Sequence, residues 1–124
     1  MTFIECGAYG KSWPKVHMFP EQTVQAHLDL KGIVLHPIHW ATFNLALHPW
    51  YEPMVRLTAA ANFNNVKIAT PVVGETTVYS TDIPSTRWWE QAMKFVRRCE
   101  KYCCYRSRYL DNIRSQKGKK TIVT

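Results

Sequence analysis

The chain has 124 residues, 46% of them hydrophobic and 20% charged, which is typical of one globular domain and excludes a disordered polymer. It contains no apolar run of about 18 residues or more, so the sequence predicts no membrane span. The first residues lack the basic stretch and apolar core of a secretory signal, so a cytoplasmic location with reduced cysteines is expected.

The net charge of +7 is concentrated in one part of the chain. Residues 1–86 carry five Lys and Arg against six Asp and Glu, whereas residues 87–124 carry eleven against three. We therefore divide the chain into a domain, residues 1–85, and a basic tail, residues 86–124. Three of the four cysteines lie in this tail with the spacing C-x3-C-C, which does not match the paired C-x2-C motifs of zinc sites.

The first half of the domain alternates between strand and helix patterns. Residues 2–6 are typical of the end of a strand, and a loop with glycines and a proline follows. A helix should begin at Pro20, because the first helical position needs no N–H, and should end at Gly32 in a left-handed cap. Residues 33–40 begin as a buried apolar strand, whose pairing is expected to stop at Pro37 because proline has no N–H to donate.

The second half of the domain continues this alternation. A second helix is expected from about Glu52, then a short strand within residues 66–70, and then a turn and another strand within residues 72–79. The pattern predicts an α/β layered fold. Because so few strands cannot close a sheet with both faces covered, we expect part of the domain to be missing. The tail should be helical from about Thr86, with only a weak apolar stripe.

The five histidines are the main candidates for chemistry. His36 and His39 would point to opposite sides of a strand end, so they are not expected to share a metal. A neutral imidazole at the carboxyl end of a buried strand is well placed to bind zinc, and this singles out His39. One histidine is not a metal site, since a catalytic zinc needs at least three protein ligands.

Two segments resemble a known family. Residues 17–30 read HMFPEQTVQAHLDL, and residues 35–46 read LHPIHWATFNLA. These segments closely resemble the C-terminal part of the metallo-β-lactamase-fold hydrolases of the N-acyl-phosphatidylethanolamine phospholipase D type, including their bacterial relatives. The spacing between the two motif histidines is kept, and the resemblance extends over about residues 1–80.

The resemblance implies the C-terminal half of an αββα sandwich with a dinuclear zinc site. His39 falls on the family's last metal-ligand histidine. His17 falls on a histidine beside the active site that is associated with substrate binding or catalysis. The implied substrate is a phospholipid-like molecule or another phosphodiester or ester. Trp40 and Phe43 would pack near the site, where a structural role is favoured for both.

The chain also departs from the family pattern. The H-x-H-x-D-H cluster, a further histidine and a bridging aspartate are absent, and the tail does not resemble the family. We therefore expect a hydrolase fragment that is inactive alone and does not hold zinc by itself, whose other ligands lie on an upstream half-domain. A truncated, partial or frameshifted reading frame would explain these departures.

An alternative function rests on the basic tail. Its eleven basic residues are interleaved with Trp88, Trp89 and tyrosines, so they could neutralise phosphates while the rings stack on bases. A variant of this hypothesis is binding to an anionic membrane surface. A solvated helix without a partner is favoured over both, because the apolar stripe is weak.

Overall fold

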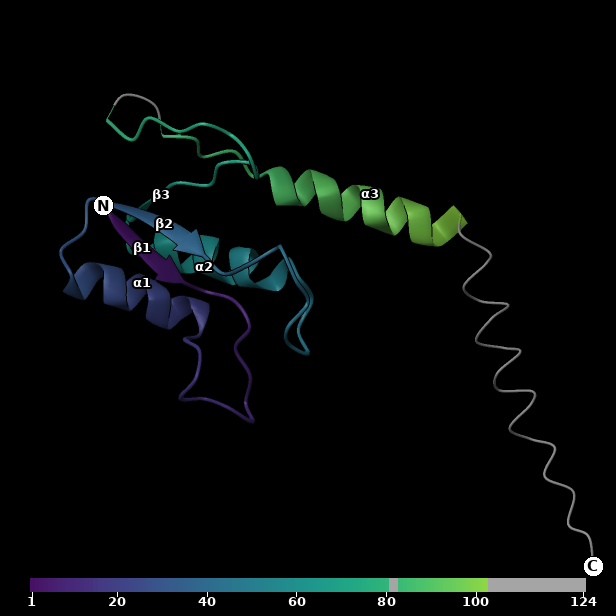
Figure 1. Cartoon of the computed structure of the whole chain (residues 1–124), viewed down its shortest axis with the longest axis horizontal. Helices are drawn as coiled ribbons and strands as arrows, with labels where there is room; N and C mark the ends of the chain where they lie inside the picture. Colours follow the sequence, from purple (N-terminus) through teal and green to yellow (C-terminus); the bar gives the residue numbers. More distant parts are fainter. Residues whose placement is uncertain (81–82, 103–124) are drawn as a thin grey trace, which may run out of the picture. The chain divides into compact units, whose positions relative to one another are not determined.

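The computed structural model describes residues 1–80 and 83–102 (Figure 1). Its elements are, in chain order, β1 (Thr2–Glu5), α1 (Pro20–Asp29), β2 (Val34–Ile38), α2 (Glu52–Phe63), β3 (Lys67–Ile68) and α3 (Trp88–Tyr102). The chain divides into two compact units, Met1–Trp89 and Glu90–Thr124. None of the helices in the described ranges is long and apolar enough to cross a bilayer.

The first unit is built on a parallel sheet with the strand order β1-β2-β3 (Figure 1). Phe3 lies opposite His36 in the β1–β2 pair, and Leu35 lies opposite Ile68 in the β2–β3 pair. Parallel neighbours need a crossover connection, which α1 supplies between β1 and β2, and α2 between β2 and β3. The predicted α/β class is confirmed.

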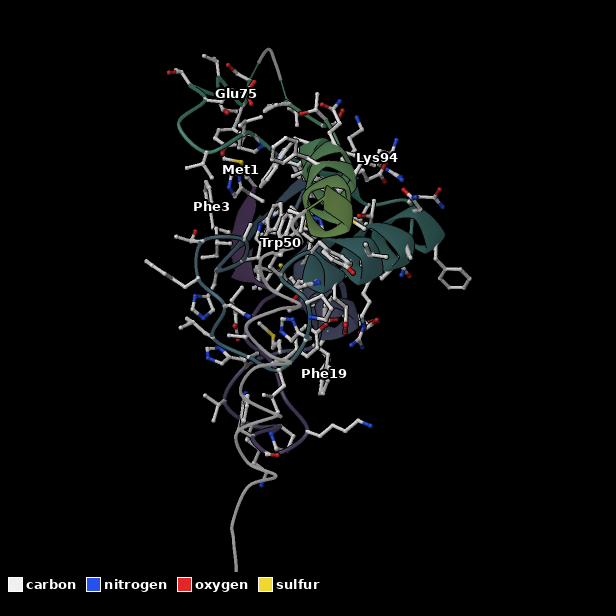
Figure 2. All side chains as sticks on the ribbon, turned by 90° about the vertical axis from the view of Figure 1, so that its right-hand side faces the viewer. Met1, Phe3, Phe19, Trp50, Glu75 and Lys94 are labelled. Carbon is white, nitrogen blue, oxygen red and sulfur yellow. The ribbon has the colours of Figure 1, made fainter. Side chains whose placement is uncertain are left out.

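Helices α1 and α2 cover one face of this sheet. Helix α1 packs against β1 and β2, α2 packs against β3, and the two helices pack against each other. The core between them consists of side chains that are buried or nearly so: Ile4, Val24, Leu35, Met54, Leu57 and Ala61. On the other face, Phe3 is 54% exposed and Ile38 is 41% exposed, and Figure 2 shows the Phe3 side chain at the surface.

The expected end of α1 was wrong by one residue. Lys31, not Gly32, has the left-handed backbone, with a φ of 52°. The N–H of Lys31 donates to the carbonyl of Leu28, and the N–H of Gly32 donates to that of His27, which is a Schellman motif. A Cβ at Gly32 would lie 2.5 Å from the His27 ring. Residue 32 is therefore glycine for space, not for a positive φ.

The expectation that strand pairing stops at Pro37 was also wrong, because β2 extends to Ile38. The carbonyl of Leu35 accepts the N–H of Ala69 on the β3 side. The backbone N–H and C=O groups of alternate residues in a strand point toward the same neighbouring strand, so the backbone nitrogen of Pro37 also points toward the β3 side. Strand β3 has already ended at Ile68. No strand residue lies opposite Pro37 on the β3 side, so its lack of an N–H costs the sheet no hydrogen bond.

Two further expectations need correction. Residues 72–79 form no strand; the N–H of Glu75 instead donates to the carbonyl of Val72 in a turn.

The apolar stripe of the tail helix is stronger than expected, since α3 is clearly more amphipathic than α1 or α2. Trp89, Met93 and Val96 follow one another at helical spacing along α3. The expected basic end, residues 103–124, lies outside the described residues.

Candidate metal centre

Three side chains with metal-binding atoms meet at the carboxyl edge of the sheet. Glu5 is the last residue of β1, and His39 follows the last residue of β2. His17 comes from the loop between β1 and α1. Each of the three offers one ligand atom within 4.8 Å of the other two, and no other such group occurs among the side chains that the structure describes, those of residues 1–80 and 83–96. Ligands of open parallel sheets bind at this edge.

The Glu5 carboxylate ties the His17 loop to the end of β1. Its Oε2 lies 2.7 Å from Nδ1 of His17, and its Oε1 accepts the backbone N–H of Met18 at 3.0 Å. The Thr23 hydroxyl, in the first turns of α1, donates to the Glu5 carbonyl at 2.6 Å. Glu5 thus fixes the position of both the histidine loop and the start of the helix.

Backbone contacts fix the position of His39. The N–H of Cys6 donates to the carbonyl of Ile38 at 3.1 Å, which continues the β1–β2 ladder up to this point. His39 then takes a left-handed φ of 62°. A Cβ at Gly7 would lie 2.1 Å from the His39 carbonyl oxygen, so only glycine fits opposite it. The exposed His39 ring lies 4.9 Å from the His17 ring, centroid to centroid.

The structure therefore brings together the two histidines that the sequence singled out, His17 and His39. The other three have different partners. His36 Nδ1 lies 2.6 Å from the Tyr79 hydroxyl, and His27 Nδ1 lies 2.6 Å from the Thr2 hydroxyl. His48 stacks on Tyr9 with the ring centroids 4.1 Å apart. None of these three belongs to the cluster at the sheet edge.

Burial keeps several titratable groups neutral near the sheet. It lowers the pKa of both His27 and His36 below the ordinary histidine value. It also raises the pKa of the Cys6 thiol far above its usual range, and the neighbouring Glu5 charge raises it further. Cys6 is fully buried and does not belong to the cluster of Glu5, His17 and His39, although it lies next to Glu5 in the chain.

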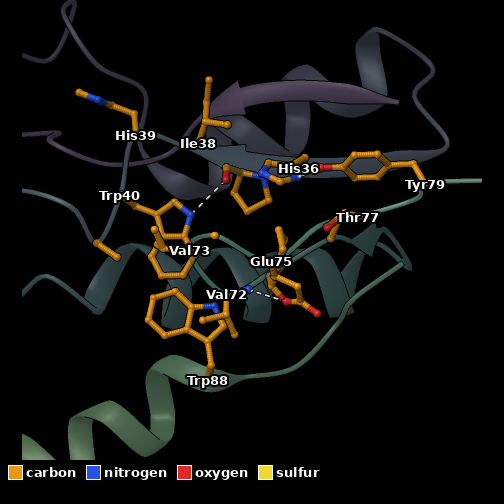
Figure 3. A pocket seen from close by; sticks show the side chains of 16 residues that line it. His36, Ile38, His39, Trp40, Val72, Val73, Glu75, Thr77, Tyr79 and Trp88 are labelled. Atoms are coloured by element: carbon orange, nitrogen blue, oxygen red, sulfur yellow. Dashed lines mark hydrogen bonds between the residues drawn. The ribbon is translucent and has the colours of Figure 1, made fainter. Parts of the chain in front are cut away.

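A cavity of about 420 Å³ adjoins the cluster at the ends of β2 and β3 (Figure 3). His39 borders both this cavity and a second one of about 280 Å³ over residues 41–46. Figure 3 shows Trp40 and Trp88 along one wall, stacked with their centroids 5.1 Å apart. Thr77 Oγ1 and Trp88 Nε1 are buried without a hydrogen-bond partner in the described part of the chain.

The two aromatic residues expected near the site differ in their surroundings. Trp40 is half-buried and donates from Nε1 to the Pro37 carbonyl at 3.0 Å. Phe43 is 76% exposed. Trp40 is thus part of the cavity wall, whereas Phe43 lies largely in solvent.

The donor set fits zinc in chemical type, since it combines imidazole nitrogens with a carboxylate. The cluster contains three residues, which is the smallest number of protein ligands that a catalytic zinc requires. Both oxygens of Glu5 already have hydrogen-bond partners, His17 and the backbone of Met18. Of the three, His39 is the residue that would hold a metal, and one ligand does not complete a catalytic zinc site.

The sequence prediction missed Glu5. A usable signal existed, because Glu5 ends a strand whose parallel neighbour delivers His39 to the same edge. The family resemblance, which extends over about residues 1–80, assigned no role to Glu5.

Comparisons with known proteins give partial matches. The chain is 42% identical over 92 residues to the uncharacterized proteins Mb0930 of Mycobacterium bovis and Rv0906 of Mycobacterium tuberculosis. The match covers 72% of this chain but 25% of each relative, so the chain spans about a quarter of their length. No protein-family description and no solved structure matches.

Proposed function

We propose that this chain supplies one part of the active site of a zinc-dependent hydrolase that cleaves phosphodiesters or related esters, similar to N-acyl-phosphatidylethanolamine phospholipase D. The observation that carries the proposal is the meeting of His17 and His39 at the carboxyl edge of the sheet, with their rings 4.9 Å apart. In this proposal the first unit is the C-terminal half of an αββα sandwich.

Each residue of the cluster has a distinct role in this proposal. His39 would hold the metal through an imidazole nitrogen, and its backbone keeps the residue at the sheet edge. His17 contacts the substrate or moves a proton beside the reacting group. When bound, zinc acidifies a water molecule and polarises the phosphodiester. The adjoining cavity, bordered by His39 and walled by Trp40 and Trp88, holds the organic part of the substrate.

The missing ligands are proposed to lie on an upstream half-domain that covers the open face of the sheet. Parallel sheets are almost always covered on both faces. Here Phe3 and Ile38 remain largely exposed on the face opposite to α1 and α2. The mycobacterial relatives have about three-quarters of their length beyond the matched segment, which leaves room for such a half-domain.

A chimera tests this function. The 92 matched residues of this chain replace the corresponding segment of Rv0906, and bound zinc and hydrolysis of bis(p-nitrophenyl) phosphate are measured. We expect zinc-dependent hydrolysis that falls about a hundredfold or more in His39→Ala, because even the loss of a group that only orients a metal ligand costs about 10–100-fold. His48→Ala is the matched control and should keep both readouts. A folded chimera without bound zinc or hydrolysis would contradict the proposal.

The amphipathic character of α3 supports a second candidate function. Interfacial helices combine one apolar face with a face rich in Lys and Arg. In α3, Phe95 is 69% exposed and Val96 is 41% exposed, and residues 87–124 carry eight more basic than acidic residues. We therefore keep an anionic membrane surface as the alternative partner, with nucleic acid as the less favoured one.

A further inference from the structure

We propose that Glu5 is a positioning residue that holds neutral His17 with its proton on Nδ1, so that the lone pair of Nε2 is free to face the site. Only the use of that lone pair rests on the proposed function. The tautomer itself is a property of this chain, set by contacts within the first unit.

The two contacts of Glu5 match an ionised carboxylate, which offers an acceptor to each partner. The backbone N–H of Met18 can only donate, and it donates to Oε1 at 3.0 Å. An ionised carboxylate is an acceptor at both oxygens. The 2.7 Å contact between Oε2 and Nδ1 of His17 is therefore a hydrogen bond that the histidine donates.

A neutral imidazole carries one N–H donor and one acceptor nitrogen. With the proton of His17 held on Nδ1, its Nε2 becomes the acceptor. Free histidine prefers the opposite tautomer, so this state needs a partner to maintain it. The side chains of His17 and Glu5 are 29% and 24% exposed, which shields the bond from water. Such carboxylate–histidine pairs fix both ring orientation and the reactive nitrogen in hydrolytic sites.

The same contacts argue against Glu5 as a direct metal ligand. Both of its oxygens already accept hydrogen bonds, one from a side chain and one from the backbone. Coordination by Glu5 would have to replace one of these bonds and release the His17 loop. In this proposal Glu5 therefore acts through His17 and not on the metal itself.

The test is the ¹⁵N spectrum of the histidine rings in the full chain at a pH about two units above the ordinary histidine pKa of ~6.5. No metal is added. We expect the His17 signals of the Nδ1–H tautomer in the wild-type chain. Glu5→Gln should reverse the tautomer, because the single amide oxygen takes the Met18 N–H and the amide NH₂ then donates to Nδ1. Glu5→Asp should restore the original tautomer, at least in part.

Glu21→Gln is the matched control, since Glu21 lies on α1 and pairs with Arg56. It should leave the His17 signals unchanged. A wild-type His17 with its proton on Nε2 overturns the proposal, whether or not the variants fold. A folded Glu5→Gln chain that keeps the Nδ1–H tautomer overturns it as well. Both results are independent of the chimera, whose failure would remove the hydrolase function and leave the tautomer in place.

Discussion

At the scale of single residues, Arg56 connects the two helices with the loop after β1. Its Nε and one terminal nitrogen donate to the two oxygens of Glu21 at 2.9 and 2.7 Å. The guanidinium also lies 5.0 Å from the centroid of the Tyr9 ring and 5.4 Å from that of Phe19. Burial tends to raise the pKa of Glu21, but the bonds from Arg56 outweigh this and lower it.

Arg56→Lys should therefore destabilise the fold by about 1 kcal/mol, because a lysine cannot form the paired hydrogen bonds or stack on two rings. The free energy of unfolding in urea measures this loss. Lys11→Arg, at an exposed position, is the control and should have no effect. An Arg56→Lys chain as stable as the wild type would show that these contacts add nothing.

His27 predicts a pH dependence of stability. Its side chain is buried at 2% exposure, and burial lowers the pKa of the folded state below the ordinary value of ~6.5. Between these two pKa values the unfolded chain binds a proton that the folded chain does not. Stability should therefore fall as the pH drops below about 6.5 and level off below the folded pKa.

His36 contributes in the same direction, because burial lowers its pKa too. His27→Gln removes one titrating group and should make the decline in the unfolding free energy between about pH 7 and pH 5 shallower. His27→Gln with an unchanged slope would exclude His27 as a cause of the decline.

At the scale of elements, the starts of α1 and α2 were predictable, whereas the ends of α1 and β2 were not. Pro20 and Glu52 mark the starts through local chemistry that depends on one or two residues. The role of Gly32 depends instead on the His27 ring, and the tolerance of Pro37 depends on where β3 ends. These are tertiary facts, which local sequence patterns do not contain.

The buried face of α2 gives a direct test of this packing. Leu57 is fully buried between the helices and the sheet, whereas Val55 on the same helix is 48% exposed. Leu57→Ala should cost about 2–5 kcal/mol of unfolding free energy, because it removes buried methyl groups and leaves a cavity. Val55→Ala should cost less than about 1 kcal/mol. Equal losses in urea denaturation would contradict the assignment of the buried face.

At the scale of the whole molecule, the sequence predicted two of the three residues in the cluster. His39 could be singled out because it follows a buried strand, and His17 because of the family resemblance. Glu5 could not be assigned in this way, since its role depends on parallel pairing and on a loop that folds back to it. The number of available metal ligands is likewise a property of the folded arrangement.

The chain alone should not retain stoichiometric zinc through dialysis against a chelator. His39 is the ligand it offers freely, while Glu5 is engaged with His17 and Met18. Metal content by mass spectrometry after dialysis checks this expectation. Tightly held zinc at one ion per chain, lost in His39→Ala, would show that this chain completes the site by itself.

The basic tail predicts salt-dependent binding to vesicles that contain phosphatidylserine, and none to vesicles of phosphatidylcholine alone. Each basic residue near an anionic surface contributes about 1 kcal/mol, so reversing the charges of Lys94, Arg97 and Arg98 should abolish binding in sedimentation assays. Reversal of Lys11 and Lys15 in the first unit is the control. Binding to RNA but not to anionic vesicles would favour the nucleic-acid alternative.

The close approach of Gly7 to residue 39 has a consequence for variation at this position. Any other amino acid at position 7 would place its Cβ where the carbonyl oxygen of His39 lies. The end of β2 would have to move before the new side chain could fit. The imidazole that follows would move with it. Gly7→Ala is therefore expected to disturb His39, the candidate metal ligand, although the histidine itself is unchanged.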